Sequence, residues 1–162
     1  MSMIGNYKRI PVQILQELIL DPDSVTDLLY SNETPFSEET DLDLDKSWHA
    51  IHFLLTGKPG EAPPPLGNAV LGGTPIGADL GYGPTRYLTP EQVYDVTVGL
   101  ATISRAELLS RFKAGEFEKN KIYSKWDESP ADFEYIGSNY ERLIAFFSKA
   151  AQAGDAILIY IV

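Results

Sequence analysis

Two histidines three residues apart are the rarest chemistry-bearing side chains of this chain, and two carboxylates lie close to them. They are His49 and His52, preceded by Asp43 and Asp45. A histidine near its ordinary pKa of about 6.5 exchanges protons readily, and a carboxylate one helical turn away can orient its ring. The spacing therefore suggests a general acid/base site. In such a site His52, or His49, would transfer the proton, and Asp45 or Asp43 would orient the histidine ring.

The same residues are compatible with two other sites. His-x-x-His spacing can place two imidazoles on one metal ion, with Asp45 or Asp43 as the carboxylate ligand. The stronger His-Glu-x-x-His motif is absent, and the chain has no cysteine to ligate a metal or form a disulfide. In the structural interpretation, which we favour, His52 bonds a backbone carbonyl, an aspartate caps the helix and Trp48 anchors the core. We expect no metal and no cofactor.

Motifs for nucleophilic or phosphate chemistry are missing. Ser47, Thr56 and Thr74 are generic hydroxyl groups, and no Gly-x-Ser-x-Gly elbow accompanies them. The glycine-rich runs 72–77 and 81–83 match neither phosphate-binding pattern, and no lysine follows them. These glycines are better explained by a tightly folded loop.

A second group of candidates would bind rather than react. Arg86 and Tyr87 end the glycine-rich segment, where they could hold an anion or stack on a partner. Trp48 would form the wall of a pocket, and Asp43 would supply a carboxylate beside it. Each also has a structural explanation, as a salt-bridge partner, a core anchor or a helix cap.

Length and charge limit the classes of function. The 162 residues predict one domain with a substantial core. The net charge of −10 disfavours nucleic acid and anionic membranes as partners, because both repel an acidic surface. No apolar leader precedes residue 10, and the longest apolar run, residues 156–162, is far below the roughly 20 residues of a membrane span. We expect a cytoplasmic protein.

The histidines are expected on a helix over about residues 45–56. Leu44, Trp48, Ile51 and Leu55 recur at helical spacing and form its apolar stripe, and Gly57 suits the position after its end. Beside that stripe, a narrow polar strip would carry both imidazoles. This strip should meet the segment that follows the helix.

That segment, residues 57–86, holds 8 of the 13 glycines and 6 of the 11 prolines. It predicts a long ordered loop on the body of the domain, with one short helix near residues 68–71. It is the most adaptable part of the expected surface.

The remaining elements predict an α/β fold. Strands are expected over residues 3–10, 41–44, 86–88 and 156–162, and the last one, apolar at every position, should be central in its sheet. Thr89-Pro90-Glu91-Gln92 is a capping box that opens a helix to about Ile103, and Ser104 with Glu107 opens another that ends at Gly115. A polar connection over residues 116–131 leads to a helix at about 138–152. Together they predict a layered sandwich with a small mixed sheet and helices on both faces.

Several strings resemble the signature of the bacterial YfbM-like family. They are Leu42-Asp43-Leu44-Asp45-Lys46, Trp48, Ile51-His52-Phe53, Leu55-Thr56-Gly57, Ala69-Val70-Leu71-Gly72-Gly73 and Tyr87-Leu88-Thr89-Pro90-Glu91. The resemblance covers essentially the whole chain. It implies a single α/β domain of unknown function with no assigned catalytic residues, and His52, unlike His49, belongs to the motif.

The function that these observations favour is a non-catalytic binding or protein-interaction domain of the cytoplasm, with an unknown protein or small molecule as partner. The alternative is a small hydrolase-like enzyme that uses His52 as general acid/base with Asp45 or Asp43.

Overall fold

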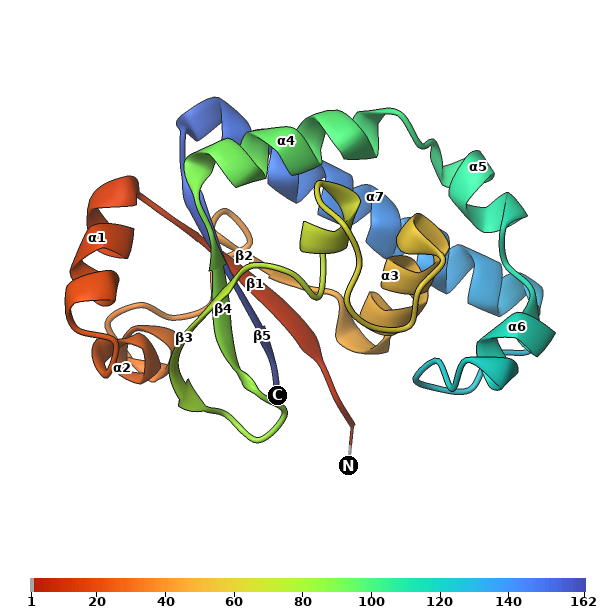
Figure 1. Ribbon diagram of the computed structural model, residues 1–162, viewed down its shortest axis with the longest axis horizontal. Helices are drawn as coiled ribbons and strands as arrows, with labels where there is room; N and C mark the ends of the chain where they lie inside the picture. The colour runs from red at the N-terminus through yellow and green to blue at the C-terminus, as the bar shows by residue number, and fades with distance from the viewer. Residues whose placement is uncertain (1) are drawn as a thin grey trace.

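A five-stranded sheet separates two helical layers in the computed structural model, which describes residues 2–162 (Figure 1). The strand order is β2-β1-β5-β4-β3. The strands are β1 (Gly5–Ile10), β2 (Asp41–Asp43), β3 (Thr74–Asp79), β4 (Pro84–Leu88) and β5 (Ala156–Ile161). The helices are α1 (Val12–Leu20), α2 (Ser24–Tyr30), α3 (Trp48–Thr56), α4 (Pro90–Ala101), α5 (Arg105–Ser110), α6 (Ala114–Lys119) and α7 (Pro130–Ala153). There are also two 3-10 turns. The first, η1 (Asp45–Ser47), precedes α3, and the second, η2 (Leu66–Asn68), follows the proline run at residues 63–65.

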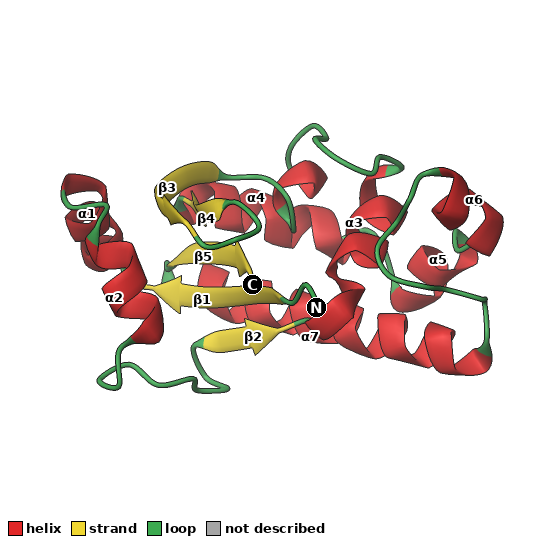
Figure 2. Cartoon of the chain, turned by 90° about the horizontal axis from the view of Figure 1, so that it is seen from below, coloured by secondary structure: helices red, strands yellow, loops and turns green. Residues whose placement is uncertain are grey.

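The C-terminal strand is the central one, as predicted. Ile157, Ile159 and Ile161 of β5 contribute to the larger hydrophobic core, which lies under α3 to α7. Ala156 and Leu158 face the smaller core under α1 and α2. Successive residues of a strand point to opposite faces, so an uninterrupted apolar strand is buried on both sides. The layered α/β fold with helices on both faces is confirmed (Figure 2).

The sheet is antiparallel throughout, whereas a mixed sheet was expected. The reason is the connection from β4 to β5, which runs out along α4 and returns along α7. These two helices pack antiparallel: Thr97 Oγ1 of α4 donates to Phe147 O at 3.1 Å, and Tyr140 Oη of α7 donates to Ile103 O at 2.7 Å. The chain therefore re-enters the sheet at the same end of the strands where it left, and β5 runs opposite to β4.

The helices after α4 differ from the predicted ones. Gly115 lies inside α6 instead of ending a helix, and α7 begins at Pro130, about two turns before the expected start. Ser129 caps α7 by accepting from Asp132 N at 3.1 Å. Gly137, which weakened the helical pattern, allows Arg105 to approach: a Cβ there would lie 2.4 Å from its Nε. A tertiary contact therefore explains a glycine that the local pattern could not.

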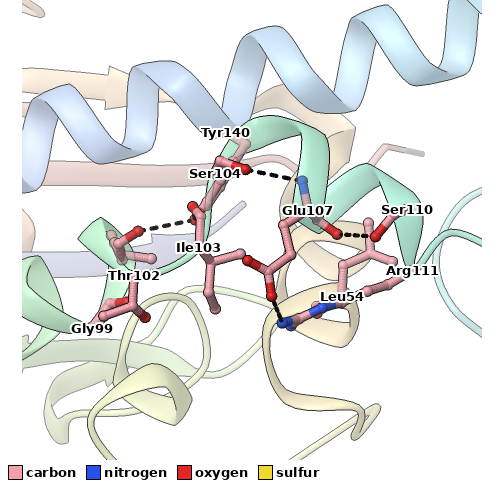
Figure 3. Close-up of polar contacts among 10 residues, drawn as sticks. Leu54, Gly99, Thr102, Ile103, Ser104, Glu107, Ser110, Arg111 and Tyr140 are labelled. Carbon is pink, nitrogen blue, oxygen red and sulfur yellow. Dashed lines mark hydrogen bonds and ion pairs between the residues drawn. The ribbon is translucent and has the colours of Figure 1, made fainter.

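The capping box of α4 is present as predicted, with Thr89 and Gln92 exchanging hydrogen bonds. The second predicted box is only half formed (Figure 3). Ser104 accepts from Glu107 N at 3.1 Å, but the Glu107 carboxylate accepts from Arg111 instead of returning to Ser104 N. Arg111 also donates to Leu54 O at 2.9 Å, so this side chain joins α5 to α3.

The glycine- and proline-rich segment contains a β-hairpin, β3–β4, that the loop prediction missed apart from residues 86–88. Its prolines occupy positions that strands tolerate: Pro75 lies on the edge strand β3, and Pro84 is the first residue of β4. Gly77 has φ +81°, and the register shifts between Ile76 and Asp79. Within residues 2–162, no helix is long and apolar enough to cross a membrane.

Candidate functional site

The two predicted histidines hold the chain that follows their own helix. Residues 57–72 form an irregular strip, which we call the ledge, lying along α3 and α4 (Figure 1). Imidazole, phenol and guanidinium groups from three other elements reach the ledge, and each binds one or two of its backbone carbonyls. The predicted helix at 45–56 and its contact with the following segment are both present, the first turn being 3-10.

His52 is buried, with none of its surface exposed. Its Nε2 lies 2.6 Å from Gly60 O, which assigns the proton to Nε2, while Nδ1 is buried without a partner. Burial lowers the pKa of His52, and the carbonyl of Gly60 opposes this only in part. A second proton would sit on Nδ1 with no acceptor, so the neutral ring is the form that fits.

His49 uses both ring nitrogens. Its Nε2 lies 2.7 Å from Pro59 O, and its Nδ1 accepts from Tyr123 N at 2.9 Å. The neutral Nε2–H tautomer satisfies both contacts, because a proton on Nδ1 would face the Tyr123 amide. Burial is the main cause that lowers the pKa of His49. The ring stacks on Trp48 with centroids 5.0 Å apart and an angle of 13° between the planes.

Tyr7 and Arg86 hold the far end of the ledge. Tyr7 Oη donates to Ala69 O at 2.6 Å, and Arg86 Nη1 donates to Val70 O at 2.9 Å and Gly72 O at 2.8 Å. Burial raises the pKa of Tyr7 and lowers that of Arg86. In residues 2–162 no ion pair includes Arg86, so carbonyl dipoles take the place of a carboxylate.

The sheet brings these two side chains together. Tyr7 and Arg86 both lie opposite Ile159, one on each side of β5, so they form one row on the same face. Tyr87, the neighbour of Arg86, packs on the opposite face with the smaller core. The predicted pair of Arg86 and Tyr87 is therefore divided between two faces, because consecutive strand residues alternate.

The carboxylates lie away from the imidazoles. Asp43 Oδ1 accepts from Asp45 N at 2.6 Å, and Asp45 Oδ2 accepts from Tyr135 Oη at 2.7 Å. The N-cap of α3 is Ser47, without a side-chain cap bond, so neither aspartate caps the helix as expected. Asp45 has φ +50°, and this left-handed residue directs the side chain toward α7 instead of along the polar strip.

The acid/base hypothesis requires an accessible His52 beside a carboxylate. Within the described chain, no carboxylate bonds either imidazole, and no group of three or more histidine, aspartate or glutamate side chains lies close enough to hold a metal. The hydrolase alternative stays a prediction, and it requires the ledge to move away from α3.

Trp48 is buried and donates from Nε1 to Met3 O at 3.0 Å. It borders a shallow concavity of about 520 Å³ together with His49 and Tyr123. Since the ring nitrogens of Trp48 and His49 are already bonded, this wall offers mainly ring surface. Tyr7 is the clamp of the ledge that sequence reasoning missed. It lies in no motif, and only its contact with Ala69 O reveals it.

Comparison with known proteins agrees with this arrangement over the whole chain. Residues 1–160 match the family described as a domain of unknown function, DUF1877. The chain belongs to this family. It is 29% identical to protein YfbM of Escherichia coli (strain K12), over 100% of this chain and 99% of that protein.

The crystal structure titled as a protein of unknown function, YfbM from Escherichia coli, has the same fold. Its TM-score is 0.76 at 26% identity, and the match covers 98% of this chain and 99% of that one. The DUF1877 family and this relative are both described as being of unknown function. A function for this chain must therefore be argued from its own surface.

The ledge forms one side of an apolar concavity of about 630 Å³, which we call the α4 groove. Pro64, Pro65 and Asn68 line one side, and Tyr94, Val98 and Gly99 of α4 line the other. Gly99 permits close packing, since a Cβ there would lie 3.2 Å from Leu66 and 3.3 Å from Pro65. The groove thus lies at a close-packed junction between the ledge and α4.

Proposed function

We propose that this protein is a binding domain whose α4 groove receives an apolar segment of a protein partner that carries a basic residue. The observation that supports this most strongly is the use of the imidazoles and the guanidinium as clamps on the ledge. Side chains that could perform chemistry are instead bonded to backbone carbonyls, and the ledge they hold borders the groove.

The groove has the surface properties of an interaction site. Tyr94 and Val98 are 62% and 49% exposed, although most large apolar side chains of α4 are buried. Exposed aromatic and aliphatic side chains beside a concave surface are typical of recognition sites, with tyrosine among the enriched types. Hydrogen bonds to five carbonyls hold the ledge in place before a partner arrives, and a surface ordered in advance loses less entropy on association.

The charge of the groove favours a basic partner. Asp95 is its only formally charged lining residue, and the whole chain carries −10. A carboxylate on a surface of net negative charge attracts basic segments and repels acidic ones, and this attraction raises the association rate at low salt. The same charge disfavours nucleic acid and anionic membrane as occupants.

The test is selection from a random linear peptide library, followed by fluorescence anisotropy with the selected peptides. We expect these peptides to combine aromatic or aliphatic residues with lysine or arginine. Val98→Asp should abolish their binding, and Asp95→Asn should weaken it and reduce its salt dependence.

Leu20→Asp is the matched control, because Leu20 is 86% exposed on α1 in the other helical layer. It introduces the same charge at an exposed apolar position and should bind like the parent protein. Peptides that bind Val98→Asp as tightly as the parent would contradict the proposal.

A further inference from the structure

A further concavity, of about 300 Å³, lies beside the edge strand β2, between the loop over residues 31–41 and α7. We call it the β2 cleft. Figure 2 shows this loop leading from α2 into β2, and α7 contacts β2. The volume is at the lower end of the range for small-molecule sites, which begins at about 300 Å³. Its size therefore suits a small organic molecule.

The two walls of the cleft carry opposite charges. Glu38 and Glu39 line the loop side, and Arg142 and Lys149 line the α7 side. Within residues 2–162, none of these four side chains takes part in an ion pair. The cleft thus keeps separated carboxylates and cations that a ligand with both charges could pair at once.

One buried residue, Asp41, helps to fix the acidic wall, and Arg9 Nε also donates to Glu39 O at 2.8 Å. Asp41 is 5% exposed, and its carboxylate accepts from Ser37 N at 3.1 Å and from Thr40 Oγ1 at 2.8 Å. The other side of this carboxylate pairs with the buried Lys8, with Nζ 2.9 Å from Oδ1. Glu38 and Glu39 lie between the bonded residues 37 and 40, so the backbone that carries them is held in place.

The cleft also has an apolar lining. Leu42 and Phe146 are buried core residues that also line the cleft, and Phe36 is 59% exposed beside them. An exposed phenylalanine beside a charged cleft can cover the apolar part of a ligand. The two walls carry charges of opposite sign, with aromatic and aliphatic surface between them. Such a site suits a small zwitterionic molecule that has an apolar side chain.

We infer that the β2 cleft binds a free α-amino acid with an apolar side chain. Its ammonium group would face Glu38 and Glu39, its carboxylate would face Arg142 and Lys149, and its side chain would lie against Phe36 and Phe146. Pairing with the ligand satisfies both walls without bringing them together. This site is independent of the α4 groove and of the partner proposed there.

The experiment is isothermal titration calorimetry of the full chain with L-leucine, L-methionine and L-phenylalanine. At least one should bind, and its N-acetyl and its carboxamide derivatives, which each lack one charge, should bind at least about threefold more weakly. Threefold corresponds to about 0.6 kcal/mol, the scale of one exposed charge pair.

Variants test the two walls separately. Glu38→Gln combined with Glu39→Gln should weaken the free amino acid and leave the N-acetyl derivative unchanged. Lys149→Gln should show the opposite preference, with the carboxamide unchanged. Glu61→Gln and Lys125→Gln remove the same charges from exposed positions outside the cleft and should bind like the parent. Failure of all three amino acids to bind, or equal binding of the neutralised derivatives, would overturn the inference.

Discussion

The ledge and the loop over residues 31–41 are both irregular segments fastened to the same sheet, but by opposite means. On the ledge, four side chains from β1, α3 and β4 donate to five carbonyls spread over residues 59–72. On the loop, a backbone amide, a hydroxyl and a lysine converge on the single carboxylate of Asp41. The side-chain bonds of the ledge are therefore distributed over several carbonyls, whereas the buried ion pair of the loop and two of its hydrogen bonds share one carboxylate.

This difference determines how each segment should respond to substitution. When the hydrogen bonds that hold a segment are distributed along it, losing one leaves the others in place and costs about the energy of one buried hydrogen bond. When they converge on one buried charge, removing it also leaves the opposite charge without a partner. One substitution should therefore cost the loop about 2 kcal/mol more than it costs the ledge, although both segments are irregular.

The largest effect is expected at Asp41. Asp41→Leu leaves the ammonium of Lys8, which is 6% exposed, buried without a partner, and should lower the free energy of unfolding by about 3–5 kcal/mol. Urea denaturation at neutral pH measures this. Adding Lys8→Met should restore part of the loss, because an apolar pair no longer buries a charge. A cost below about 1 kcal/mol, typical of an exposed pair, would show that the loop does not depend on this one residue.

A smaller effect is expected for one ledge clamp. Tyr7→Phe removes the donor to Ala69 O and should cost about 1–3 kcal/mol, since a buried carbonyl loses its partner. Tyr94→Phe, at an exposed tyrosine, makes the same chemical change without a buried bond and serves as the control. Equal costs for the two variants would mean that the hydroxyl of Tyr7 does not hold the ledge.

Acid should weaken the ledge through His52. Its folded pKa is below its ordinary value, so the unfolded chain binds the extra proton first as pH falls. The stability is fully present above about pH 6.5 and is lost below it, down to the lowered folded pKa, at no more than about 1.4 kcal/mol per pH unit. Unfolding at several pH values should show a steeper dependence for the parent than for His52→Gln. Parallel curves would exclude His52 as the source.

The smallest effect is expected in the α4 groove. Val98→Ala should change the free energy of unfolding by no more than about 0.5 kcal/mol, because the side chain is half exposed and fastens neither segment. Thermal unfolding together with the peptide assay separates the two roles. Loss of peptide binding at unchanged stability would show that Val98 serves binding and does not help to hold the ledge or the loop. A large loss of stability would show that it does.

Local signals in the sequence accounted for much of the fold. The capping box at Thr89, the apolar strand over residues 156–162 and the apolar stripe of α3 are short-range patterns, and each corresponds to an observed element. The start of α7 was misplaced by about two turns, and Gly137 in that part of the helix is explained only by its contact with Arg105, distant in sequence. The hairpin β3–β4 was missed because proline and glycine are depleted from strands in general but are tolerated at edges and bulges.

The candidate site divides in the same way. The sequence alone predicted that the helix with His49 and His52 would lie against the segment after it, because the spacing places both rings on one polar strip beside the apolar stripe. Only the tertiary structure decided what those rings bind, since Asp45 turns away toward Tyr135 and the carbonyls of the ledge take its place. It also brought Tyr7 and Arg86 into one row across β5, a contact between residues 79 positions apart that local patterns do not encode.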